Sequence, residues 1–454
     1  MIKRRTWAAL LMSETTTDGG FSPGAGVRGV RSPPTFRDSA DALVDSGGLE
    51  QPSGSRGLLL LADGTRLEGR LFGAEAIAQG ELVFTTGMCG YQESLTDPSF
   101  AGQVLTFTYP LLGNYGILPG ISESSSVHPR GVVCHQHIPF PDHRDSIGSV
   151  HDLLVAHEVP GIECVDTRSL TRRVREHGTL LCVFGPAEKS PEMERILREM
   201  TSPDADDLVS EVTIDQSVLL NPRAEDKDGR PMHRLAVIDC GIKYNILREL
   251  CLRFEVVWCP ATMPFGEIVE KWSPDAVFAS NGPGDPAHPG AATDARNSLA
   301  AAVREGLPVM GICLGHQLMG LAAGLRTYKL RYGHRGSNQP VLDIETGRVH
   351  ITSQNHGFAV EDPVKGMLAP HPSGARSEGG ENVLGSPFKV RHINSNDGTV
   401  EGLDLLDKPA FTIQFHPEAC PGPHDASQLF DRFQAMVASQ LQPATATITE
   451  RGGA

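Results

Sequence analysis

Three residues far apart in the chain are of types, and in settings, that suit covalent catalysis. Cys313 has Gly311 two residues before it and Gly315 two residues after it. This is the Gly-x-nucleophile-x-Gly spacing of a nucleophile elbow, with sulfur in place of a serine hydroxyl. Much later in the chain, His416 and Glu418 stand two residues apart with a proline between them. A thiol, a histidine base and a carboxylate that orients the histidine make a triad for acyl transfer.

Each half of this pattern also has a plainer interpretation. A lone Gly-x-Cys-x-Gly fits a buried core cysteine at the end of a strand, and most histidines in loops are simply solvated. The catalytic interpretation is favoured because both halves are expected in one sheet. The helix expected after Cys313 points its amino terminus at the sulfur. That helix end, like a nearby histidine, lowers a thiol pKa from about 8.5. We therefore predict Cys313 as nucleophile, His416 as base and Glu418 as the carboxylate that orients it.

The residues around this triad alternate strand patterns with helix patterns. A short strand leads into Cys313, and other strands are expected at 235–239, 254–258, 276–280 and 411–415. Helices are expected at 244–252, 265–271, 291–304, 317–323 and 429–439. Such alternation predicts a doubly wound parallel α/β sheet, with a β-rich end that includes strands at 341–344 and 349–351. Ligands bind such sheets at the carboxyl ends of strands, where Cys313 and His416 are expected.

Two loops at strand ends are candidates for substrate contacts. Ser280–Pro286 reads Ser-Asn-Gly-Pro-Gly-Asp-Pro, and its glycines allow backbone N–H groups to approach a ligand closely. One such N–H, with that of Leu314 after the nucleophile, is expected to form an oxyanion hole. Gln354–Phe358 offers a polar edge and an aromatic wall. The plainer alternatives are a Pro-Gly surface turn and a strand-ending turn with a core phenylalanine.

Composition argues against several functional classes. The formal net charge of −15 argues against nucleic acid or an anionic membrane as the main partner. The nine cysteines form no C-x-x-C pair, which argues against a zinc ribbon or a disulfide framework and favours a reducing compartment. No apolar run reaches the ~20 residues of a membrane span. The sequence also lacks a Walker phosphate loop, a dinucleotide fingerprint and an evident metal cluster. We therefore expect no cofactor and no metal in this chain.

The chain of 454 residues is long enough for two or three domains. Its first part is rich in Gly, Ser, Pro and Thr without periodicity and is expected to be disordered. An α+β domain follows, with a hairpin at 57–69, a polar, turn-rich segment at 90–100, and helices at 150–158, 167–175 and after Pro191. The expected divisions are a disordered extension at 1–56, an α+β domain at 57–212, a linker at 213–232, the α/β domain at 233–439 and a loose tail at 440–454.

Several of these motifs together resemble one protein family. Gly311–Gln317, His416–Glu418 and Ser280–Pro286 are similar to the class I glutamine amidotransferase family, over roughly 233–439. Further segments resemble, more narrowly, the small, glutamine-hydrolysing subunit of carbamoyl-phosphate synthetase. They are Gly90–Ser99, Gly113–Gly116, Asp166–Arg168, Asn355–Phe358 and Pro417–Asp425. The wider resemblance covers 57–439. The chain departs from it in the 1–56 extension and in Cys420, where serine is usual.

This resemblance implies hydrolysis of glutamine to glutamate and ammonia through a Cys-His-Glu triad and a thioester intermediate. It implies that the ammonia passes through a tunnel to a large synthetase subunit, in a heterodimer or a higher oligomer. That subunit would bind ATP and magnesium and make carbamoyl phosphate for pyrimidine and arginine biosynthesis. Residue by residue, the resemblance makes Cys313 the nucleophile, His416 the base and Glu418 its orienter. Glutamine-binding positions carried over by motif are Ser99, Gly282, Gly284, Leu314, Gln317, Asn355, Gly357 and Phe358.

Three other functions compete with this one. A glutaminase subunit of another glutamine-dependent synthetase would share 233–439 but would not explain 57–212. A cysteine peptidase or esterase would share the elbow, and testing glutamine against peptide and ester substrates separates it. A non-catalytic scaffold is expected to lack the cysteine or the histidine, and both are present. We expect a cytoplasmic location, or an organelle if residues 1–56 act as a transit peptide.

Overall fold

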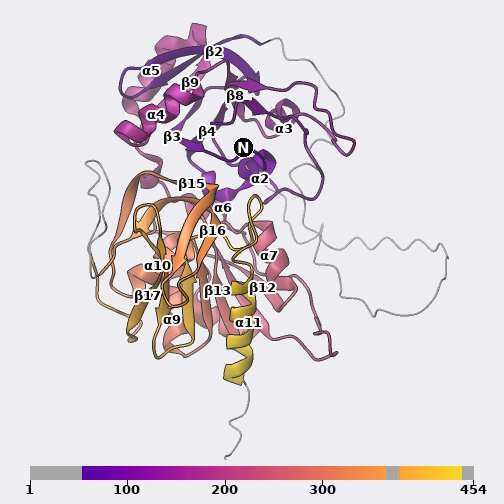
Figure 1. Cartoon of the computed structure of the whole chain (residues 1–454), viewed down its shortest axis with the longest axis vertical. Coiled ribbons are helices and arrows are strands. Elements are labelled where there is room, and N and C mark those ends of the chain that lie inside the picture. The colour runs from indigo at the N-terminus through magenta and orange to yellow at the C-terminus, as the bar shows by residue number, and fades with distance from the viewer. Residues whose placement is uncertain (1–53, 364–376, 378, 442–454) are drawn as a thin grey trace, which may run out of the picture.

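The computed structural model describes residues 54–363, 377 and 379–441, which form two adjoining domains (Figure 1). Most of the predicted 1–56 extension and of the 440–454 tail lies outside these residues. Among the described residues, no helix combines the length and apolar character needed to cross a membrane.

The first domain is built around a closed β-barrel whose strands run in the order β1-β2-β8-β6-β4-β3-β9. The strands are β1 (Arg56–Leu61), β2 (Arg66–Gly73), β3 (Ala78–Thr85), β4 (Gln103–Phe107), β6 (Gly131–Val133), β8 (Pro160–Glu163) and β9 (Leu180–Pro186). The predicted hairpin at 57–69 is confirmed, since β1 and β2 pair antiparallel with Leu59 opposite Leu67. A second, two-stranded sheet joins β5 (Leu111–Leu112) to β7 (Gln136–His137).

The three helices predicted in this domain are confirmed as α3 (Val150–Ala156), α4 (Thr167–His177) and α5 (Ser190–Glu199). Short 3₁₀ turns, η3 (Ala187–Lys189) and η4 (Pro203–Ala205), and a small helix, α6 (Leu208–Val212), complete it. Asp166 caps α4 by accepting a hydrogen bond from the backbone N–H of Ser169, as expected for an N-cap aspartate.

The segment at 90–100 is not the irregular, turn-rich stretch that its polarity predicted. It forms α2 (Tyr91–Thr96) and a 3₁₀ turn, η2 (Pro98–Phe100). The buried face of α2 consists of Tyr91, Gln92, Leu95 and Thr96. Because this face includes polar residues, the sequence did not show the apolar pattern of a helix. The side chain of Asp97 caps the second turn by accepting the N–H of Ser99.

The second domain is a ten-stranded sheet in the order β10-β12-β11-β13-β14-β19-β18-β16-β15-β17. Its parallel part confirms the predicted doubly wound α/β fold, and its antiparallel part confirms the predicted β-rich end. The strands are β10 (Val218–Leu219), β11 (Arg234–Asp239), β12 (Glu255–Pro260), β13 (Ala276–Ala279), β14 (Val309–Ile312), β15 (Thr327–Asp343), β16 (Val349–Val360), β17 (Phe388–Asn394), β18 (Val400–Leu405) and β19 (Ala410–Ile413).

Helices cover both faces of this sheet. Leu299 of α9 (Ala291–Arg304) packs in one core with residues of α8 (Phe265–Trp272) and α10 (Leu314–Ala322). Phe433 of α11 (Gln428–Leu441) packs in the other, together with α7 (Tyr244–Cys251). Alternate residues of β11 enter the two cores, Ile238 on one side and Val237 on the other. This packing on both faces holds the strands of the sheet in place. It therefore also holds the carboxyl edge of the sheet, where the elbow lies.

Two sequence-based boundaries need correction. The predicted linker at 213–232 contains β10, which pairs antiparallel with β12 and forms an edge of the sheet. The predicted strands at 341–344 and 349–351 are only the ends of β15 and β16, which are much longer. Their other parts carry buried polar residues such as His334 and Gln354, which hid the strand pattern.

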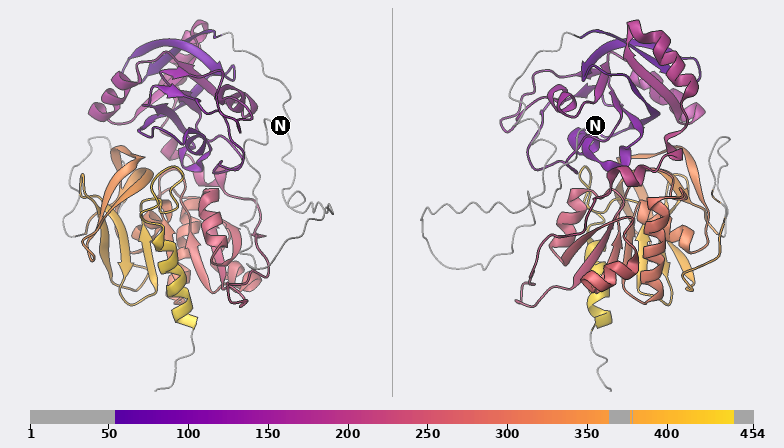
Figure 2. Two further views of the ribbon diagram at one scale, coloured as in Figure 1. Left: turned by 45° about the vertical axis from the view of Figure 1, so that its right-hand side comes forward. Right: turned by 180° about the vertical axis from the view of Figure 1, so that it is seen from behind.

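The two domains meet where β15 reaches the barrel, an arrangement visible from both sides in Figure 2. The N–H of Thr179 donates to the carbonyl of Arg331 across this contact at 3.0 Å. The rings of Phe84 and Tyr332 stack across it with centroids 6.1 Å apart. The carboxyl edge of the second domain therefore faces the barrel rather than open solvent.

Candidate active site

Cys313 occupies a strained turn between β14 and α10. Its backbone φ is 53° and its ψ is −102°, a region that residues other than glycine rarely adopt. Its N–H donates to the carbonyl of Ile413 at 2.8 Å, which ties the turn to the neighbouring strand. Its thiol lies 3.7 Å from the carbonyl oxygen of Asn355.

The two flanking glycines are required by close backbone contacts. A Cβ on Gly311 would lie 2.8 Å from the carbonyl oxygen of Gly315, and a Cβ on Gly315 would lie 2.3 Å from that of Ala279. Helix α10 begins directly after Cys313, three residues earlier than predicted, so the N–H of Leu314 is its first. That N–H has no acceptor within the helix.

His416 and Glu418 form a buried pair beside the elbow. Nδ1 of His416 lies 2.7 Å from Oε1 of Glu418, and both side chains are almost fully buried. Burial lowers the pKa of His416, but the charge of Glu418 and the contact with Cys313 outweigh it and raise that pKa to about 10. This pair thus favours the protonated form of His416.

A buried lysine, which was not predicted from the sequence, completes this arrangement. Nζ of Lys243 lies 3.0 Å from Oε1 of Glu418, 3.0 Å from the carbonyl of Ala419 and 2.9 Å from that of Cys420. Burial raises the pKa of Glu418, but Lys243 and His416 outweigh it and hold that pKa at about 2. The carboxylate is thus kept ionised between two cations.

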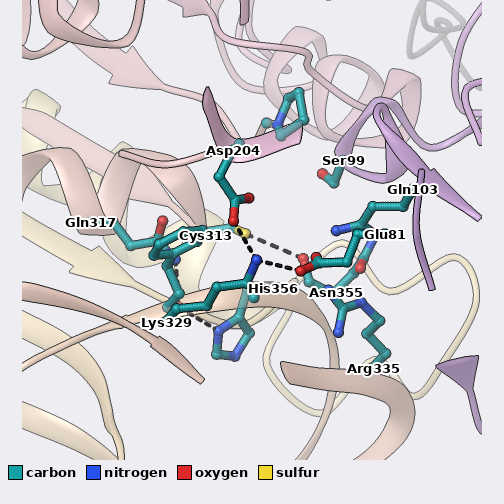
Figure 3. A pocket seen from close by; sticks show the side chains of 15 residues that line it. Glu81, Ser99, Gln103, Asp204, Cys313, Gln317, Lys329, Arg335, Asn355 and His356 are labelled. Carbon is teal, nitrogen blue, oxygen red and sulfur yellow. Dashed lines mark hydrogen bonds and ion pairs between the residues drawn. The ribbon is translucent and has the colours of Figure 1, made fainter. Parts of the chain in front are cut away.

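A pocket between the domains opens onto Cys313 (Figure 3). Among the predicted glutamine-binding residues, those lining it are Ser99, Gly282, Gly284, Gln317, Asn355, Gly357 and Phe358. Leu314, His416 and Glu418 do not line it. Leu314 follows Cys313 directly in the chain, and His416 and Glu418 contact each other outside the pocket lining.

Hydrogen bonds across the domain boundary fix the pocket walls. The side-chain amide of Asn281 donates to Oγ of Ser99 at 3.0 Å, and that of Asn355 donates to Asp97 at 2.8 Å. Within the second domain, the amide of Gln317 donates to the carbonyl of Phe358 at 2.8 Å. The barrel therefore contributes part of the site that the second domain builds around its thiol.

Two family models match this chain. One, described as "Carbamoyl-phosphate synthase small chain, CPSase domain", matches residues 59–184, and "Glutamine amidotransferase class-I" matches residues 236–436. A carbamoyl phosphate synthase small chain of Methanopyrus kandleri is 43% identical over 387 residues, which is 84% of this chain and 99% of the relative. Those of Syntrophotalea carbinolica and Archaeoglobus fulgidus are 40% and 42% identical, over 85% and 84% of this chain and 99% and 98% of their own lengths.

The chain belongs to the carbamoyl phosphate synthase small chain family. This confirms the resemblance inferred from the elbow, the His-Pro-Glu segment and the motifs of the first domain.

The pocket also contains charged residues that the sequence analysis did not single out. Lys329 forms ion pairs with Glu81 of β3 and Asp204 of η4, and Figure 3 shows its amine between the two carboxylates. Burial lowers the pKa of Lys329, but Glu81 and Asp204 outweigh it and raise that pKa. Arg335 lies nearby and is 4% exposed. The remaining lining residues are Gln103, which was not predicted, and Pro283 and His356, which lie in the two loops predicted to contact the substrate.

One buried group beside this pocket has the composition of a metal site, namely His334, His356 and Glu401. Both ring nitrogens of His356 already have partners, the carbonyl of Phe358 at 2.7 Å and the side chain of Gln354 at 3.1 Å. Burial lowers the pKa of His334, but Asp397 and Glu401 raise it to about 9. A protonated histidine offers no lone pair, so this group is better described as an ion cluster that supports β15 and β16.

Proposed function

We propose that this chain is the glutaminase subunit of a carbamoyl phosphate synthase and that Cys313 is its nucleophile. The observation that carries the proposal is the strained elbow, which presents the thiol to a pocket with the His416–Glu418 pair directly behind it. The match of residues 59–184 to a small-chain domain disfavours the alternative of a glutaminase serving another synthetase.

The first half of the reaction forms a thioester. The thiolate sulfur of Cys313, paired with the imidazolium of His416, attacks the side-chain amide carbon of glutamine, and a C–S bond forms as the carbonyl becomes an oxyanion. We assign the stabilisation of that charge to the N–H of Leu314 and one N–H of the Ser280–Pro286 loop, such as that of Gly282. A Cβ on Gly282 would lie 2.1 Å from the carbonyl of Cys240, so only glycine lets the loop come this close. When the C–N bond breaks, the imidazolium of His416 gives its proton to the departing nitrogen, which leaves as ammonia.

The second half hydrolyses the thioester. His416, now neutral, takes a proton from a water molecule as the water oxygen attacks the thioester carbon. The C–S bond breaks, glutamate leaves, and the thiolate and imidazolium are restored. Glu418 accepts a hydrogen bond from Nδ1–H of His416 throughout, which leaves Nε2 for the proton transfers, and Lys243 keeps Glu418 ionised. This division of roles follows the general logic of a nucleophile, a base and an orienting carboxylate.

We further propose that the ammonia is used by a large synthetase subunit that binds ATP and magnesium, and that the barrel helps to dock that subunit. The barrel already supplies Ser99 and Glu81 to the pocket, so docking on the barrel would adjust the pocket directly. We propose a cytoplasmic location. All nine cysteines are free, which suits a reducing compartment.

The test is the variant Cys313→Ser. A serine hydroxyl is hardly ionised near neutral pH, so we expect glutamine hydrolysis to be lost. With the large subunit, the variant should still make carbamoyl phosphate from added ammonia, which shows that it folds and docks. Unchanged glutamine turnover by a pure sample of Cys313→Ser would disprove the proposed role of Cys313.

A further inference from the structure

Glu123 is a buried residue of the first domain that holds the start of α7 in the second domain. The backbone N–H of Tyr244 donates to the carbonyl of Glu123 at 2.8 Å, and the N–H of Asn245 donates to its Oε2 at 3.0 Å. Helix α7 has no capping side chain at its own N-cap residue, Lys243. Glu123 therefore supplies acceptors, from across the domain boundary, for N–H groups that have none within the helix.

The first residues of α7 in turn hold the segment that carries the triad carboxylate. Nζ of Lys243 donates to Oε1 of Glu418 and to the carbonyls of the two residues that follow it. The side-chain amide of Asn245 donates to the carbonyl of Glu418 at 2.8 Å. Glu123 therefore holds the two residues that fix the position of Glu418.

The charges along this path alternate in sign. The buried groups that form it are Glu123, Lys243, Glu418 and His416. When all four are ionised, two are negative and two are positive, so their charges cancel. Burial lowers the pKa of Lys243, but the carboxylates of Glu418 and Glu123 outweigh it and raise that pKa. Without the charge of Glu123, the path would carry a net positive charge, which disfavours the imidazolium of His416.

The ionisation of Glu123 depends on the groups that face it. They are Lys243 and Arg248 of α7, and Glu418 and Cys420 of the segment after β19. Burial raises the pKa of Glu123 to about 7, against the opposing charge of Lys243. Glu123 is therefore ionised above about pH 8. This range includes the pH at which His416, with its pKa of about 10, loses its proton.

We propose that Glu123 is a positioning residue for glutamine hydrolysis, which holds the start of α7 against Glu418 and balances the charges behind His416. The proposal rests on the proposed glutaminase function. Glu123 does not line the pocket that opens onto Cys313, so it acts through Lys243 and Glu418. Because Glu123 belongs to the first domain, it makes the triad of the second domain depend on how the two domains are placed.

A purely structural role for Glu123 would have different consequences. If Glu123 only capped α7, replacing its carboxylate would lower the melting temperature, and turnover would change by the same factor at every alkaline pH. If Glu123 also balances charge, removing its charge lowers the pKa of His416. The pH at which activity is lost on the alkaline side then falls as well.

The experiment measures glutamate release from glutamine, by the chain with its large subunit, across the alkaline pH range. Glu123→Gln keeps the shape and an acceptor oxygen but removes the charge, whereas Glu123→Asp keeps the charge on a shorter side chain. The matched control, Glu188→Gln, removes an exposed glutamate of η3. The alkaline limit of kcat/KM reports the ionisation of the free enzyme, and the ionisation of free glutamine is common to all samples.

We expect Glu123→Gln to move the alkaline limit of kcat/KM down by about half a pH unit to one unit. Its kcat should fall by about three- to thirtyfold, with little change in KM, because Glu123 does not line the pocket. Glu123→Asp should lower kcat but keep the alkaline limit of wild type. Glu188→Gln should change neither quantity.

An alkaline limit that stays at the wild-type pH in Glu123→Gln would overturn the inference, and so would an equal shift in Glu123→Asp. Carbamoyl phosphate synthesis from added ammonia measures folding and docking of each variant. If Glu123→Gln fails that measurement, Glu123→Met replaces it, since methionine has a similar length without charge, and the same results decide. A wild-type chain, assayed with its large subunit, that releases no glutamate from glutamine would instead refute the proposed function.

Discussion

The substitution Lys243→Met isolates the contribution of a positive charge that lies behind the triad. Nζ of Lys243 is 3.0 Å from Oε1 of Glu418, and the two side chains are 4% and 0% exposed. With an effective dielectric constant of about 20, two unit charges at this distance attract by roughly 5 kcal/mol. The loss of this attraction is partly offset, because the variant no longer has a lysine to desolvate on folding. Removing one partner of a buried ion pair typically costs about 3–5 kcal/mol, and methionine keeps most of the side-chain volume.

We expect this loss to reach catalysis through Glu418. Without Lys243 the carboxylate loses one of its two neighbouring cations, its pKa rises, and it orients His416 and stabilises the positive charge of His416 less well. Turnover of glutamine should fall by about ten- to a thousandfold, with a smaller change in KM, because removing an orienting carboxylate outright costs about 10⁴. The assay measures kcat and KM for glutamine, with ammonia-dependent synthesis in the complex as the measure of folding. Lys271→Met, which removes an exposed lysine bonded to Ser217, is the control. Turnover of Lys243→Met within twofold of wild type would show that catalysis does not depend on the charge of Lys243.

Three further predictions concern the triad and its elbow. Glu418→Gln should lower glutamine turnover less than His416→Asn, because the carboxylate orients while the imidazole carries the proton; equal, near-wild-type rates in both would place the base elsewhere. Gly315→Ala should abolish activity and lower the melting temperature, since its Cβ would lie 2.3 Å from the carbonyl oxygen of Ala279; a fully active, stable variant would show that the turn can relax. The pKa of His416 is raised from 6.5 to about 10, so its stabilising contribution is complete below pH 6.5 and is lost as the pH rises through 10. The melting temperature of wild type should therefore fall across that range, and that of His416→Asn should fall less; parallel curves would contradict the raised pKa.

The sequence was most informative where local geometry restricts residue type. Gly311 and Gly315 can only be glycine because backbone atoms come within 2.8 Å and 2.3 Å of their missing Cβ atoms, so the elbow is marked in the sequence itself. The alternation of strands and helices in the second domain could also be predicted, because burial restricts the residue types there. Strands buried on both faces are continuously apolar, and their helices carry a single apolar stripe.

The sequence was least informative where single charged residues meet across elements. Lys243, Lys329 and Arg335 have no local signal, since a lone lysine or arginine usually lies on a solvated face. Their importance comes from burial next to Glu418, or next to Glu81 and Asp204, which only the tertiary fold creates. Buried polar residues within β15 and β16 also hid these two strands. A strand that lines a site breaks the apolar alternation by which strands are recognised.

Acid-quenched mass spectrometry shows directly whether Cys313 forms a covalent bond to the substrate. The chain, with its large subunit, is mixed with glutamine, quenched in acid during turnover and digested. A glutamyl thioester should be found on the peptide that contains Cys313, and it should be absent from Cys313→Ser treated in the same way. A glutamyl adduct on another of the nine cysteines, or continued turnover by Cys313→Ser with no adduct, would contradict the account.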